Sequence, residues 1–121
     1  MTAHDLARRA VAAPHWRWMP GMRAVGRRRM PAAWFRVEEY TRMVGEWRDA
    51  LPDLDDPATV GALLALVREA WGDDRVSSVA NTVYGTRMIL MPDDAAPEGE
   101  RLIGCSTTEA EALVIALEAA P

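Results

Sequence analysis

The strongest constraint on the fold is one helix whose beginning and end are both marked in the sequence. Asp56 is a favourable N-cap residue, and Pro57 suits the first helical position, where its missing N–H would have no partner anyway. Gly72 can adopt the left-handed conformation that ends a helix. Between them, apolar side chains recur at helical spacing and form one stripe: Val60, Leu63, Leu64, Val67, Ala70 and Trp71. The sequence therefore predicts an amphipathic helix over residues 57–71 that must bury this stripe.

Two further helices are predicted at the ends of the chain. Thr108 and Glu111 have capping-box spacing at the start of a helix over residues 109–120. Thr2 can cap a shorter helix over residues 3–12, which Pro14 would stop. Five side chains of the two longer helices should be largely buried: Leu63, Leu64, Val67, Leu113 and Leu117.

The segments between the helices have the composition of strands. The expected strands are residues 22–25, 34–40, 43–47, 76–83, 86–91 and 101–105, with a hairpin turn at Tyr84-Gly85. We therefore expect a single α+β domain over residues 1–121. Its small antiparallel sheet should be covered on one face by the helices at 57–71 and 109–120.

Charge is divided unequally along the chain. Residues 1–50 hold ten Arg and five acidic residues, whereas residues 51–121 hold four Arg and thirteen acidic residues, so the halves are near +5 and −9. A basic surface attracts an anion, which can be nucleic acid, an acidic protein, or the other half of the same chain. The asymmetry alone does not choose among these three.

The basic half contains the most informative group of candidate binding residues. Arginine binds phosphate or carboxylate through paired hydrogen bonds and stacks on aromatic rings, and both residue types are enriched at protein–protein hot spots. Nucleic-acid-binding proteins interleave the same residue types. The predicted partner-binding residues are Arg23, Arg27, Arg28, Arg29, Trp34 and Arg36. The competing interpretation is that Trp16, Trp18 and Trp34 belong to the core and the arginine run is a solvated turn.

Catalysis and metal binding have little support in the sequence. Cys105 has no His near it in sequence, and His4 and His15 have no evident catalytic companion, so a half-buried structural cysteine is the simpler interpretation. Asp53, Asp55 and Asp56 lack the further ligands and spacing of a metal loop. A single cysteine excludes an internal disulfide and fits a reducing cytoplasm. We expect no enzyme activity, no cofactor, no metal and no membrane span.

Three sequence blocks carry a resemblance. They are Trp16 to Met22, Leu51 to Thr59 running into Leu63 to Gly72, and Thr108 to Leu113. With these blocks the chain resembles a group of small, uncharacterised proteins of tailed bacteriophages and prophages. The resemblance implies a phage-borne accessory protein and assigns no role to any residue.

A second, weaker resemblance concerns the order of elements. Residues 57–120 are expected to form a helix, three strands and a helix, which is similar to double-stranded RNA-binding domains. Those domains place Lys residues at the start of the last helix, where this chain has Glu109 and Glu111, which would repel phosphate. Binding to an RNA duplex by this half is therefore disfavoured.

The sequence as a whole favours one function and leaves one alternative open. The favoured function is a small phage-encoded, non-catalytic protein that binds and modulates a host or phage protein in the host cytoplasm. The alternative is a nucleic-acid-binding accessory protein that uses the segment 16–36. The charge division is also compatible with self-association into a homo-oligomer.

Overall fold

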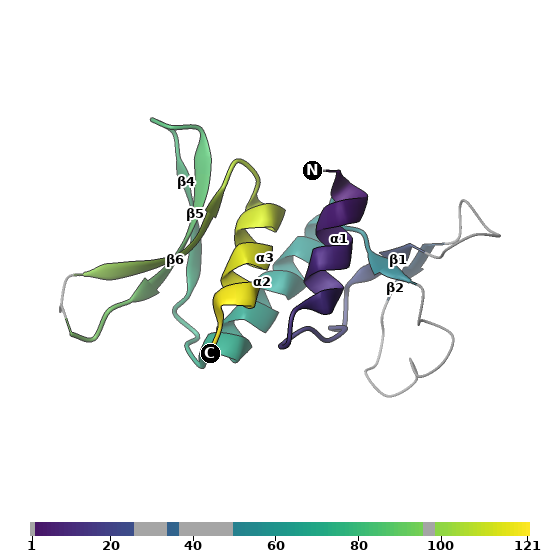
Figure 1. Cartoon of the computed structure of the whole chain (residues 1–121), viewed down its shortest axis with the longest axis horizontal. Helices are drawn as coiled ribbons and strands as arrows, with labels where there is room; N and C mark the ends of the chain where they lie inside the picture. Colours follow the sequence, from purple (N-terminus) through teal and green to yellow (C-terminus); the bar gives the residue numbers. More distant parts are fainter. Residues whose placement is uncertain (1, 26–33, 37–49, 96–98) are drawn as a thin grey trace.

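A sheet lies at each end of the molecule, and three helices lie between the two sheets (Figure 1). The computed structural model describes residues 2–25, 34–36, 50–95 and 99–121. Along the chain the described elements are α1 (Ala3–Ala12), β1 (Arg23–Val25), β2 (Trp34–Arg36), β3 (Leu51–Pro52), α2 (Pro57–Trp71), β4 (Ser77–Asn81), β5 (Thr86–Pro92), β6 (Glu100–Ser106) and α3 (Glu109–Ala119). The predicted α+β fold class is confirmed.

The helix ends follow the local chemistry that the sequence predicts. The Asp56 carboxylate accepts a hydrogen bond from the Thr59 N–H at 3.0 Å, and Gly72 ends α2 with φ of +66°. Thr2 and Asp5 form a reciprocal capping box at the start of α1. The Thr108 hydroxyl accepts a hydrogen bond from the Glu111 N–H at 3.2 Å at the start of α3. All three predicted helices are confirmed to within a residue at each end.

The strands form two antiparallel sheets rather than one. The C-terminal sheet has the order β4-β5-β6, and the predicted turn at Tyr84-Gly85 connects β4 to β5, with Gly85 at φ of +63°. The N-terminal sheet has the order β2-β1-β3 and contains the two predicted strands that begin near residues 22 and 34. Residues 37–40 and the predicted strand 43–47 lie outside the described residues.

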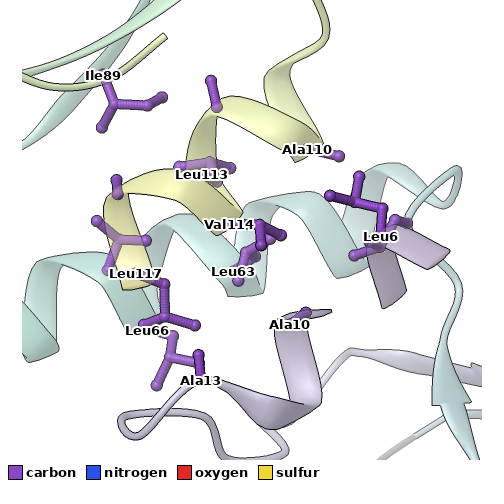
Figure 2. Close-up of a cluster of buried hydrophobic side chains, with 14 of the residues drawn as sticks. Leu6, Ala10, Ala13, Leu63, Leu66, Ile89, Ala110, Leu113, Val114 and Leu117 are labelled. Atoms are coloured by element: carbon purple, nitrogen blue, oxygen red, sulfur yellow. The ribbon is translucent and has the colours of Figure 1, made fainter. Parts of the chain in front are cut away.

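The helices share one hydrophobic core. Helix α3 packs directly on β5 and β6, and α2 and α1 pack against α3 on the side away from that sheet (Figure 1). Figure 2 shows Leu113 and Leu117 of α3 between Ile89 of β5 and the side chains of α2. Leu63, Val67, Leu113 and Leu117 are fully buried, as predicted. The core therefore depends on α3 as its central element.

The buried side of α2 is turned relative to the predicted stripe. Leu66, which the predicted stripe omits, is buried, whereas Leu64 is partly buried and packs against the edge of the core. Thr59 is also fully buried. Its hydroxyl tolerates this position because it donates to the Asp56 carboxylate and accepts from the Arg23 N–H, both at 2.8 Å. This polar contact and the position of α3 together orient the helix, and neither is visible in the apolar spacing.

Gly61 of α2 and Gly104 of β6 differ in how closely other parts of the chain approach them. A Cβ atom at Gly61 would have no atom within 4 Å. A Cβ atom at Gly104 of β6 would lie 2.2 Å from the carbonyl oxygen of Ala112 and 3.0 Å from the Cβ of Ala116. The absence of a side chain at Gly104 therefore allows α3 to lie against the sheet.

Candidate functional site

The predicted basic site is only partly within the described structure. Arg27, Arg28 and Arg29 lie outside the described residues. The register of β1 and β2 places Arg23 opposite Arg36 and Val25 opposite Trp34, so three of the six predicted residues share one small sheet. Arg23 is partly buried, and its Nε lies 4.0 Å from the Asp53 carboxylate.

Several arginines of the basic half pair with carboxylates of the acidic half. Arg9 bonds to Glu118, and Arg17 bonds to Glu69. The hydrogen bond to Glu118 raises the pKa of the Arg9 guanidinium. Partly exposed pairs of this kind contribute only about 0–1 kcal/mol each to stability. They show, however, that the chain's own acidic half is one partner of its basic half.

Two of the tryptophans belong to the periphery of the core. Trp16 and Trp18 contact each other edge to face, with ring centroids 5.5 Å apart, and both pack against the hydrophobic cluster of the helices. Rings held in this way have less surface free to stack on nucleic-acid bases. Of the two interpretations of these tryptophans, the structure therefore favours the core.

The residues considered for catalysis lie on different parts of the described chain, with His4 on α1, His15 in the loop after it and Cys105 on β6. Cys105 is exposed on β6, so the expectation of a half-buried cysteine is wrong. His15 Nε2 lies 2.7 Å from the Pro121 oxygen. Asp56 caps α2, which confirms the simpler interpretation of that residue. Within the described ranges, no group of three or more His, Cys, Asp or Glu residues is arranged to hold a metal ion.

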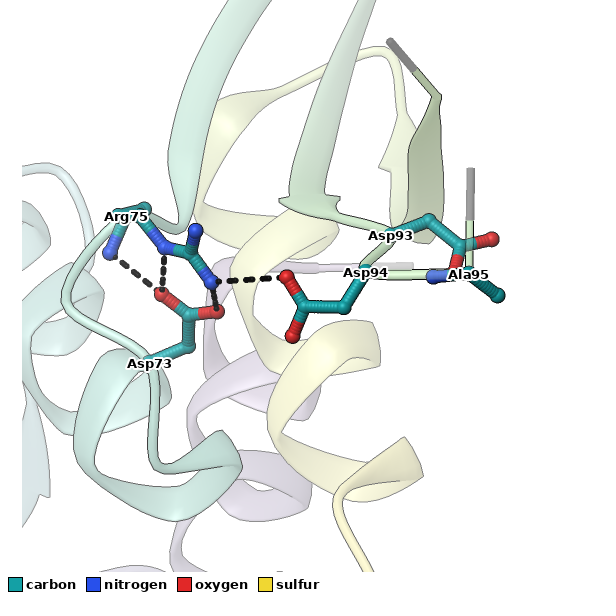
Figure 3. Close-up of polar contacts among 5 residues, drawn as sticks. All are labelled: Asp73, Arg75, Asp93, Asp94 and Ala95. Atoms are coloured by element: carbon teal, nitrogen blue, oxygen red, sulfur yellow. Dashed lines mark hydrogen bonds and ion pairs between the residues drawn. The ribbon is translucent and has the colours of Figure 1, made fainter. Parts of the chain in front are cut away.

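A cluster of opposite charges connects the loop after α2 to the end of β5 (Figure 3). The Arg75 guanidinium donates to both carboxylate oxygens of Asp73 at 3.0 Å and lies 3.5 Å from Asp94. The side-chain hydrogen bond from Arg75, followed by that from its backbone N–H, lowers the pKa of Asp73. Each charged group of this cluster has a local partner, so we interpret the cluster as a structural contact between two loops.

We expect Arg75→Ala to raise the pKa of Asp73 towards the ordinary aspartate value of about 3.9. The shift should be partial, because the backbone N–H of residue 75 still donates to Asp73. A lowered folded-state pKa stabilises the fold above the unfolded-state value, and this contribution is lost as the pH falls through the folded value. NMR titration of the carboxyl carbons measures the shift. Asp5, whose pKa is lowered by Thr2, is the internal control and should not move.

A pocket of about 600 Å³ lies where the first turns of the three helices meet. Its lining includes Leu6, Leu54 and Val60 together with the acidic residues Asp55, Glu109 and Glu111. Helix N-termini attract anions, but here acidic side chains already occupy the first turns of α1 and α3. Among the described residues that line the pocket none is Arg, so its chemistry disfavours an anionic ligand.

The most distinctive surface of the described structure is the face of the β4-β5-β6 sheet that points away from α3 (Figure 1). Ile89 is buried against α3, so its neighbours Met88 and Leu90 point to the opposite side. The register places Val79 and Cys105 beside Met88, and Leu102 beside Leu90. We call this set the outer strip: Val79, Met88, Leu90, Leu102 and Cys105.

The outer strip is accessible as well as apolar. Leu102 is 53% exposed and Val79 is 39% exposed. At the tip of the β4–β5 hairpin, Val83 and Tyr84 are 82% and 78% exposed. Four of the five large exposed hydrophobic residues of the described chain therefore belong to this one sheet and its turn. Apolar groups concentrated on one exposed face are typical of an interaction surface.

A signal for this surface is present in the sequence, although the prediction of binding residues missed it. In a strand with one solvated face, polar residues normally alternate with buried ones. Met88 and Leu90 flank the buried Ile89, so β5 is apolar on both faces. The described helices lie on one face of this sheet, so the continuous apolar run in β5 indicates that the other face also contacts an apolar surface.

Comparisons with known proteins give no further assignment. No protein-family model, no curated protein and no solved structure matches the chain. Across the described ranges, no helix is both long enough and apolar enough to cross a membrane.

Proposed function

We propose that the chain is a small phage-encoded accessory protein that binds and modulates a host or phage protein and has no catalytic activity of its own. The observation that carries the proposal is the outer strip, an apolar face on which no described helix packs. The three sequence blocks similar to phage proteins support the phage origin. The contacting surface of the partner should be apolar, because the outer strip contains no charged residue.

The internal ion pairs favour a protein partner over nucleic acid. Arg9 and Arg17 are paired with carboxylates, and Arg23 lies near Asp53, which reduces the positive charge that is free to meet phosphates. The acidic residues that line the helix pocket add to this, since negative charge there would repel a polyanion. For these reasons we rank the nucleic-acid alternative second.

We expect Leu102→Glu to weaken the complex with a partner by about tenfold or more, because it buries a carboxylate in an apolar contact. The partner is first captured from a bacterial lysate and then purified, and its affinity is measured by calorimetry with each variant. Ala65→Glu is the matched control, because it adds the same charge at an exposed position on α2. Equal affinities of the two variants would contradict a role for the outer strip.

The nucleic-acid alternative is tested on the basic segment. Reversing Arg27, Arg28 and Arg29 to Glu should abolish any binding to DNA or RNA, and wild-type affinity should fall steeply with salt if phosphates are contacted. We expect no tight complex with DNA or RNA at about 0.15 M salt. Tight binding that is lost in the reversed variant would replace the protein-partner proposal.

A further inference from the structure

The outer edge of β4 has none of the features that usually keep a strand edge from pairing. Edge strands normally carry charged residues, proline or a bulge. Strand β6, at the other edge of the same sheet, has exposed Glu100 and Arg101 and a register shift opposite Ile89 and Leu90. Strand β4 has the sequence Ser-Ser-Val-Ala-Asn, with no charge, no proline and a regular register against β5.

We propose that β4 pairs with β4 of a second copy of this chain, antiparallel and centred on Val79. A two-fold axis at this position places Ser77 opposite Asn81 of the second copy and Ser78 opposite Ala80. Every pair is small and uncharged, so no like charges meet across the axis. The two three-stranded sheets become one six-stranded sheet.

The same register gives the exposed tip of the β4–β5 hairpin a contact in the dimer. Four residues before Val79 lies Arg75, and four residues after it lies Val83, so the axis brings Arg75 of one copy beside the tip of the other. The Arg75 side chain is 60% exposed, and its aliphatic stem can cover Val83. Its guanidinium can stack on the ring of Tyr84. The two most exposed large apolar side chains of the described chain thereby gain a contact.

A second copy fits this edge better than an unrelated strand. The edge of β4 has no charged side chain that could recognise a particular strand of another protein. In the two-fold register, by contrast, small uncharged residues face each other on both sides of Val79. The contact is short, and stable interfaces usually bury about 800 Å² on each partner. We therefore infer a weak, concentration-dependent dimer, which unites the outer strips of both copies. Each copy carries a net charge of −4, so added salt should favour dimerisation.

The test is sedimentation velocity over a concentration series. We expect reversible dimerisation of the wild type and a loss of about tenfold or more in Val79→Glu and in Val79→Lys, because each sets like charges against each other at the axis. A mixture of the two variants should recover the dimer, since the charges are then opposite. Circular dichroism is the control for folding. Both variants should be folded, because the side chain of residue 79 lies on the exposed face of the sheet.

Leu102→Glu separates this inference from the proposed function. It lies on the same face at the other edge of the sheet, so it should leave the dimer intact while it weakens partner binding. Amide exchange at β4 should slow as the concentration rises. A wild type that stays monomeric at the highest concentration would overturn the inference, and so would a dimer that is unaffected by the Val79 variants. Equal loss of the dimer in Leu102→Glu would also overturn it and would indicate face-to-face packing.

Discussion

Replacing Gly104 by alanine is expected to lower the free energy of unfolding by about 3 kcal/mol, the upper part of the usual range for overpacking a core. The new Cβ would lie 2.2 Å from the Ala112 carbonyl oxygen and 3.1 Å from the Ala116 amide nitrogen. Both are backbone atoms of α3, so no side-chain rotation relieves the contact. The helix would have to move away from β5 and β6, where it forms the centre of the core.

Urea unfolding followed by circular dichroism measures this effect, and Gly61→Ala is its matched control. Gly61 lies inside α2, and a methyl group added there would have no atom within 4 Å. Alanine at this position should therefore raise the free energy of unfolding by about 1 kcal/mol through helix propensity. Opposite signs for the same chemical change would establish that the packing of α3 and not glycine itself is responsible. A Gly104→Ala protein as stable as the wild type would refute the close approach of α3 to β6.

Leu63→Ala is expected to cost about 2–5 kcal/mol, because it leaves a cavity between α2 and α3. Leu63 is fully buried, and Figure 2 shows it beside Val114 of α3. Leu64→Ala should cost only about 1 kcal/mol, because that side chain is partly exposed and leaves less of a cavity. The two substitutions remove the same atoms from adjacent positions of one helix.

The comparison is made by chemical denaturation with the slope of the transition checked for each variant. A larger effect at Leu63 would confirm the orientation of α2 that the structure gives. A larger effect at Leu64 would restore the stripe that the sequence predicts, and the position of α2 on α3 would then need revision.

Much of the secondary structure could be predicted because its signals are local. The Asp56 cap acts on Thr59, and the Thr108 cap acts on Glu111, each within three residues. Gly72 and Gly85 adopt the left-handed conformation where the sequence predicts a helix end and a turn. Such interactions depend on neighbours along the chain, so reading them requires no knowledge of the tertiary fold.

The candidate site could not be predicted in the same way. The sequence directed attention to the arginine segment, whereas the described structure presents its exposed apolar surface on the far side of β4-β5-β6. Whether Leu102 is covered depends on which elements pack on each face of the sheet, and its own neighbours in sequence do not contain that information. The ion pair between Arg9 and Glu118 likewise joins residues 109 positions apart.

The sequence by itself determined the three helices, their ends, the antiparallel hairpin and the α+β class, because caps, turns and alternation act over a few residues. Only the tertiary structure decided that the strands divide into two sheets, that Leu66 of α2 is more deeply buried than Leu64, and that Gly104 lies against the backbone of α3. Those outcomes depend on the surfaces that meet when distant segments pack, and burial is a property of both surfaces together.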